Sequence, residues 1–124
     1  MIKLIIDLGN TRAKLAIFDD QQCVAVRACS NKDLTELEGI IREYHPEKGI
    51  LSSVIHPNET VKAQLDSISF PILKLNGNTP LPIPYWEKIP KSMGADRLAV
   101  IVEAINEKPN TPLLVVDSGT CITY

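Results

Sequence analysis

Two short segments carry the residue types that bind phosphate and a metal ion. The segment "IIDLGNT" spans residues 5–11, and "VVDSGTCIT" spans residues 115–123. In each, an apolar run ends in an aspartate, and a small turn with glycine and threonine follows. Glycine lets backbone N–H groups approach an anion closely, and a carboxylate at a strand end can hold Mg²⁺ directly or through waters. The pair therefore indicates a site for phosphate and magnesium.

Lys14 follows the first of these turns and can place a positive charge near a transferring phosphoryl group. An alternative stays open, because Asp-x-Gly after a strand is common in hairpins, where the carboxylate only shapes the turn. Two copies of the pattern, flanking a helix headed by "GADR" at residues 94–97, favour the functional interpretation.

Asp96 stands at the expected N-terminus of that helix, where the helix dipole favours a carboxylate. There it can orient a primary hydroxyl and accept its proton during phosphoryl transfer. Alternatively, Asp96 only caps the helix. Arg97 can clamp a substrate carboxylate, or it can form an ordinary surface ion pair of little energetic weight.

The elements that must position these residues alternate along the chain. Three strands joined by short connections come first, and apolar periodicity then predicts helices that alternate with strands. Asn31 or Asp33 is expected to cap the first helix, and Pro57 suits the first turn of the second. The expected strands are 3–7, 13–19, 23–29, 49–55, 70–75 and a buried one at 113–124, and the expected helices are 31–45, 57–68 and 94–107.

This order predicts an α/β fold: a mixed sheet with three antiparallel strands first, then parallel strands with crossover helices. Residues 76–93 lie outside the pattern. They belong to the region with five of the nine prolines, so an extended, irregular loop is expected there. Tyr85 and Trp86 in this loop can either line a pocket or anchor the loop.

Composition narrows the function classes. The 124 residues are 44% hydrophobic and carry a formal net charge of −2, with no basic stripe, so nucleic acid is not expected as a partner. No run approaches transmembrane length, and the N-terminus does not read as a signal peptide. Three cysteines without metal-type spacing are expected to be reduced thiols in a cytoplasmic protein.

Taken together, "DLGNTRAK", "GADR" after a Pro-rich loop, and "DSGTCIT" resemble the type III pantothenate kinase family, bacterial enzymes of coenzyme A synthesis. That family is part of the actin, sugar-kinase and acetate-kinase superfamily, whose ribonuclease H-like halves hold ATP between them. The resemblance implies a ribonuclease H-like N-terminal lobe at 1–110. It also implies the first strand and phosphate turn of a truncated second lobe at 111–124, since family members are roughly twice as long.

The resemblance implies a role for each matching residue. Asp96 is the expected general base, and Asp7 and Asp117 are the expected metal ligands. The cofactors would be Mg²⁺ and a monovalent cation, K⁺ or NH₄⁺, with ATP as co-substrate in a homodimer. The expected phosphate-binding residues are Asp7, Gly9, Asn10, Thr11, Lys14, Gly119, Thr120 and Thr123, and the expected pantothenate-binding residues are Tyr85, Gly94, Ala95, Asp96 and Arg97.

The sequence departs from the family pattern in the Pro-rich loop. Glu87 stands where many members have tyrosine, so Tyr85 takes that role only if the loop shifts, and Met93 replaces a leucine. The expected function is ATP-dependent phosphorylation of pantothenate by the full-length protein, with this chain inactive alone. The alternatives are an actin-like, nucleotide-dependent assembly protein and a non-catalytic regulatory relative. The "GADR" helix, which supplies a substrate base, speaks against assembly.

Overall fold

Five strands form one mixed sheet in the first 74 residues of the computed structural model, in the order β3-β2-β1-β4-β5. Strands β1 (Ile2–Leu8), β2 (Ala13–Asp19) and β3 (Gln22–Cys29) are antiparallel neighbours. Strands β4 (Lys48–Ser53) and β5 (Ile72–Lys74) continue the sheet in parallel on the other side of β1. The predicted α/β fold, with an antiparallel start and parallel crossovers, is confirmed.

The structure describes residues 1–119 and 122–123, which divide into two units, Met1–Lys74 and Leu75–Tyr124. Each unit is described by itself below. The lobe boundary expected near residue 110 is a different division, based on the family resemblance, and it stays a prediction.

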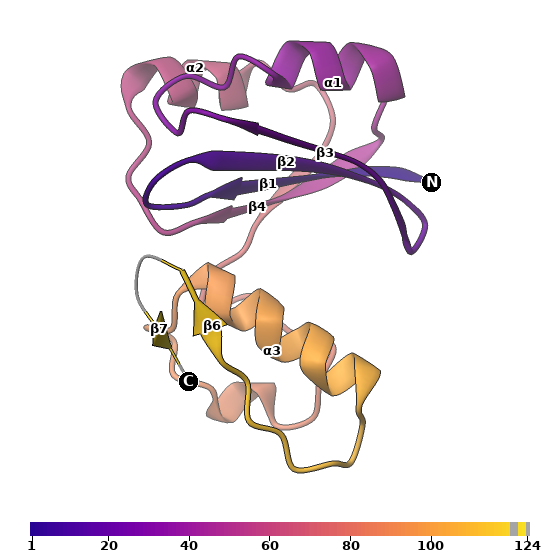
Figure 1. Cartoon of the computed structure of the whole chain (residues 1–124), viewed down its shortest axis with the longest axis vertical. Coiled ribbons are helices and arrows are strands. Elements are labelled where there is room, and N and C mark those ends of the chain that lie inside the picture. Colours follow the sequence, from indigo (N-terminus) through magenta and orange to yellow (C-terminus); the bar gives the residue numbers. More distant parts are fainter. Residues whose placement is uncertain (120–121, 124) are drawn as a thin grey trace. The chain divides into compact units, whose positions relative to one another are not determined.

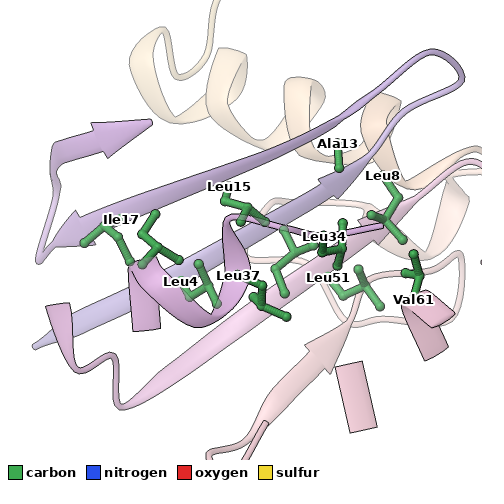
Figure 2. Close-up of a cluster of buried hydrophobic side chains, with 11 residues drawn as sticks. Leu4, Leu8, Ala13, Leu15, Ile17, Leu34, Leu37, Leu51 and Val61 are labelled. Atoms are coloured by element: carbon green, nitrogen blue, oxygen red, sulfur yellow. The ribbon is translucent and has the colours of Figure 1, made fainter. Parts of the chain in front are cut away.

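The core of the first unit lies between the sheet and two helices, α1 (Leu37–Tyr44) and α2 (Glu59–Asp66), which cover one face of the sheet (Figure 1). Alternate residues of β1 and β2 point to this face, as the two-residue period of a strand requires. Figure 2 shows these side chains meeting those of the helices and of the segment before α1. The fully buried ones include Leu4, Ile6, Leu8, Leu15, Ile17, Leu34, Ile40 and Val61.

The expected start of the first helix is wrong. Helix α1 begins at Leu37 after Glu36, which makes no side-chain cap, so neither Asn31 nor Asp33 caps it. Residues 30–34 form a loop instead, with a single bridge between Ser30 and Asp33. Leu37 and Ile40 of the helix are buried, as an apolar helical face requires, but the polar side chains before the helix are used in other contacts.

Helix α2 was predicted two residues too long at each end. Asn58 is its N-cap, and the Asn58 carbonyl oxygen Oδ1 accepts the backbone N–H of Val61 at 2.8 Å. Pro57 therefore precedes the cap and does not belong to the first turn. A side-chain cap of this kind fixes the start of a helix and is typically worth about 1 kcal/mol.

The second unit contains a short 3₁₀ turn at Trp86–Lys88, helix α3 (Ala95–Glu107), and a two-stranded ribbon of β6 (Asp117–Ser118) and β7 (Ile122–Thr123). The predicted irregular loop and the third helix are confirmed. The loop approaches itself closely at Gly77, where an added Cβ would lie 1.7 Å from the carbonyl oxygen of Lys91.

The buried strand expected at 113–124 is wrong for its first residues. Residues 113–116 are not in a strand, and Leu114 and Val116 expose 80% and 57% of their surface. In the described part of the chain no strand pairs with them, so these apolar residues are not part of a sheet. The expectations for Thr120, Cys121 and Tyr124 lie outside the described residues.

Candidate functional site

Asp7 lies near the end of β1, on the sheet face opposite α1 and α2. Its neighbours Ile6 and Leu8 point into the core, so the alternation of the strand directs Asp7 to the other face. The register pairs Asp7 with Lys14 on β2 and with Ser52 on β4. Side chains directly opposite on neighbouring strands share a face and lie close together. The sheet therefore sets a carboxylate between an ammonium group and a hydroxyl.

Ser52 was missed in the sequence. The residue exposes only 6% of its surface. Its hydroxyl oxygen Oγ has no hydrogen-bond partner among the described residues. Buried hydroxyls are normally paired, so an unpaired one beside a predicted phosphate site is a candidate donor to a bound group. Only the strand register reveals this placement, because Ser52 is far from Asp7 along the sequence.

The turn between β1 and β2 contains three of the predicted phosphate-binding residues: Gly9, Asn10 and Thr11. It is closed by a hydrogen bond of 3.0 Å from the N–H of Gly9 to the carbonyl oxygen of Arg12. A Cβ on Gly9 would lie 3.1 Å from that oxygen, which is tighter than ordinary contact. Asn10 and Thr11 are exposed at the tip. Asp7, Gly9, Asn10, Thr11 and Lys14 thus gather at one end of this strand pair.

A second missed residue holds the turn from the side. The side-chain amide of Asn31, on the loop before α1, donates to the carbonyl oxygens of Gly9 at 2.8 Å and Asn10 at 3.2 Å. In the sequence Asn31 reads as a helix cap, because asparagine before an apolar helical pattern is a cap signal. A contact across more than twenty residues leaves no local signal that would have indicated this role.

Asp96 lies in the first turn of α3, as predicted, after Gly94, whose extended backbone serves as the N-cap. One carboxylate oxygen of Asp96, Oδ1, accepts the backbone N–H of Arg97 at 2.8 Å. A negative charge at a helix N-terminus is favoured by the unpaired N–H groups there. The hydrogen bond holds this carboxylate oxygen in a fixed place, which suits both a base and a structural group.

A pocket of about 300 Å³ in the second unit brings together three predicted site residues, Arg97, Asp117 and Thr123. Asp117 and Thr123 face each other across the β6–β7 ribbon. The rest of the lining is apolar, from α3 and the segment before β6: Met93, Val100, Ile101, Leu113, Leu114 and Val115. An apolar pocket with a guanidinium and a carboxylate at its wall can hold a small molecule that has both an aliphatic part and a charged end.

Tyr85 is not among the described residues that line this pocket. It has a left-handed backbone conformation with a φ of 59°, and 72% of its surface is exposed. The ammonium nitrogen of Lys88 lies 4.9 Å from the centre of its ring, within the range of a cation–π contact. The two interpretations that the sequence left open for Tyr85, pocket lining and loop anchor, both stay predictions.

The residues present fit magnesium held jointly with a nucleotide. No group of three or more His, Cys, Asp or Glu side chains among the described residues could hold a metal by itself. Mg²⁺, however, usually takes one or two carboxylates together with substrate phosphates and waters. The Asp7 carboxylate, near the exposed glycine turn, can supply one such carboxylate, and the nucleotide phosphates and waters would supply the other ligands.

The described cysteines play no part in these sites. Cys23 and Cys29 are free thiols, as predicted. Partial burial raises the pKa of the Cys29 thiol, which favours its protonated form and makes it a poor nucleophile. Among the described residues no helix is both long and apolar enough to cross a membrane.

The fold and these sites define a mixed α/β protein with a glycine turn after the first strand and an aspartate in the first turn of α3. The family model described as type III pantothenate kinase matches residues 3–124, nearly the whole sequence. The chain therefore belongs to the type III pantothenate kinase family, as its motifs predicted.

Relatives from several bacteria agree. The chain is 44% identical to the type III pantothenate kinase of Bacteroides fragilis strain ATCC 25285 over 99% of its length and 51% of that protein. It is 43% identical to the enzyme of Phocaeicola vulgatus, with the same shares covered, and 35% identical to that of Porphyromonas gingivalis strain W83, over 98% of the chain and 49% of the relative. The chain spans about half the length of the curated relatives it matches.

Proposed function

We propose that the protein to which this chain belongs phosphorylates the hydroxyl group of pantothenate with ATP, in the first step of coenzyme A synthesis. The observation that carries the proposal is the family match over residues 3–124, which includes all three motifs. Because the chain covers about half of its relatives, the activity is proposed for the full-length protein.

The first phosphate site is assigned to the β1–β2 turn. Asp7 would hold Mg²⁺, and Lys14 and the turn residues Asn10 and Thr11 would bind phosphate oxygens. The support is that the sheet register gathers these residues on one exposed end of the strand pair. Magnesium supplies charge neutralisation between the phosphates, and phosphoryl transfer depends mainly on such neutralisation and on positioning.

The pantothenate site is assigned to the start of α3. Asp96 would accept the proton of the attacking hydroxyl, which requires an ionised carboxylate within hydrogen-bond reach. Arg97 would bind the substrate carboxylate, and the apolar pocket beside it matches the aliphatic body of pantothenate. Gly94, Ala95 and Tyr85 complete the proposed substrate contacts.

The second phosphate and cation site is assigned to the C-terminal motif, with Asp117 for the metal and Gly119, Thr120 and Thr123 for phosphate. The monovalent cation, the homodimer, the cytoplasmic location and the ribonuclease H-like ancestry are parts of the same proposal, and all of them rest on the family. The match supports them only through that membership.

The deciding experiment uses the full-length protein with ATP, Mg²⁺ and K⁺. Pantothenate-dependent ADP release, with a matching phosphorylated product in mass spectra, is the expected result. Reactions without pantothenate, or with a hydroxy acid of similar size, are the controls. ATP-dependent filament formation without product would instead favour the assembly alternative, and neither activity would favour a regulatory relative.

A further inference from the structure

The loop at residues 30–34 is hydrogen-bonded both to the β1–β2 turn and to helix α2. On one side, the Asn31 amide donates to the carbonyl oxygens of Gly9 and Asn10. On the other side, the Asn58 amide donates to the carbonyl oxygen of Lys32 at 2.9 Å. The loop is thus held at both ends by side chains that bond to backbone carbonyls.

A second pair of bonds fixes the loop against α2. The Gln64 amide nitrogen donates to Asp33 at 2.8 Å, and the Gln64 amide oxygen accepts the backbone N–H of Leu34 at 2.9 Å. Leu34 is itself buried in the core. The loop that carries Asn31 is therefore also anchored to the body of the first unit, through bonds that do not involve the turn.

The direction of the Asn31 bonds has a consequence for the turn. In a trans peptide the C=O and N–H groups point in opposite directions. Tying the carbonyls of Gly9 and Asn10 to Asn31 therefore directs the N–H groups of the following residues, Asn10 and Thr11, to the opposite side. Those two carbonyl oxygens would repel an anion. They point away from the N–H groups and accept hydrogen bonds from the Asn31 amide.

We propose that Asn31 is a positioning residue that fixes the peptide planes of the β1–β2 turn so that its N–H groups are presented to a phosphate group. The role in catalysis rests on the proposed kinase function. Asn31 itself does not touch the phosphate. It acts by keeping the turn in the binding conformation, and apparent affinity falls in proportion when that conformation is less populated.

The test compares variants of the full-length protein by steady-state kinetics. Asn31→Ala removes both bonds, and we expect KM for ATP to rise about tenfold with kcat changed less than threefold. Asn31→Asp is near-isosteric but puts oxygens against the two carbonyls, so an effect at least as large is expected. Asn31→Gln keeps the donor and should recover part of the affinity. Wild-type KM for ATP in the alanine and aspartate variants would overturn the proposal.

Ser67→Ala is the matched control, because it also removes a side-chain bond to backbone, from the Ser67 hydroxyl to the carbonyl oxygen of Gln64 at 2.6 Å. It lies at the end of α2 and should leave KM for ATP unchanged.

Hydrogen exchange measured by mass spectrometry separates this proposal from the kinase proposal. In Asn31→Ala, exchange of the Gly9 amide, whose N–H bonds to the carbonyl oxygen of Arg12 within the turn, should rise about tenfold, while that of β1 stays unchanged, whether or not the protein phosphorylates pantothenate. Unchanged exchange in the turn would overturn the role of Asn31 even in an active kinase.

Discussion

Asp96 bonds to the backbone of α3 and is also the proposed base of the reaction. Its Oδ1 accepts the N–H of Arg97 within the first turn of α3, while the N-cap itself is Gly94, which has no side chain to cap with. The structure therefore shows a carboxylate that the helix backbone holds in place. A substitution that keeps the accepting oxygen but removes the charge separates the two roles.

Asp96→Asn in the full-length protein is that substitution. We expect turnover to fall by about 10²-fold or more, because the amide cannot accept a proton from the hydroxyl. The thermal melting temperature should change little, since the asparagine oxygen can still accept the Arg97 N–H. Normal turnover would reduce Asp96 to a structural group at the helix start.

Asp7→Asn tests the first phosphate site. If Asp7 only shapes the hairpin, the change should be nearly silent, because asparagine suits tight turns as well as aspartate does. If Asp7 holds magnesium, the loss of its charge should lower turnover, with partial recovery as Mg²⁺ is raised. Turnover against Mg²⁺ concentration, with thermal melts alongside, decides between them. Superimposable curves for both proteins would contradict the metal role.

Single residues differ in how far sequence could place them. Asp7 follows from a simple pattern, an apolar strand that ends in a carboxylate and a glycine turn. Asn31 and Ser52 could not be found this way, because their roles arise from a loop contact and from a strand register. Asparagine before a helical pattern was assigned to the commoner cap, and a serine in a strand carries no pattern at all.

At the scale of elements, the start of α3 depends on the absence of a side chain at Gly94. A Cβ there would lie 2.8 Å from Oδ1 of Asp96, and the flexible carboxylate would have to move. In the full-length protein, Gly94→Ala should lower turnover about tenfold by displacing the carboxylate, with a stability change of about 1 kcal/mol or less.

Gly39→Ala on α1 is the control for Gly94→Ala. A Cβ at Gly39 would meet only the Arg27 guanidinium, at an ordinary 3.6 Å, so turnover should not change. Equal turnover in both variants would show that the carboxylate at α3 tolerates displacement.

Strand and helix types followed from periodicity, but several element boundaries did not. Helix α1 starts later than its apolar pattern because the polar residues before it bond across to the turn and to α2. The segment 113–116 has the composition of a buried strand, yet no described strand lies beside it. An apolar pattern shows that a segment can form a buried strand, but the segment does so only where a neighbouring strand is available.

For the whole molecule, we expect the 124-residue chain alone to show no appreciable kinase turnover. The superfamily that it resembles holds ATP between two lobes, and the chain covers about half of its relatives. Pantothenate-dependent ADP release by the isolated chain, compared with the full-length protein at equal concentration, is the measurement. Comparable rates would contradict the two-lobe requirement.

We expect the β1–β2 turn and the start of α2 to be thermodynamically linked through the 30–34 loop. Asn31 bonds to the turn, and its neighbour Lys32 is held by Asn58, the cap of α2. An anion that orders the turn should therefore also slow the fraying of α2. Because such coupling is reciprocal, loosening the cap should weaken anion binding by the same factor. Substitutions at the start of α2 are then expected to change anion affinity at the β1–β2 turn, which α2 does not contact through these bonds.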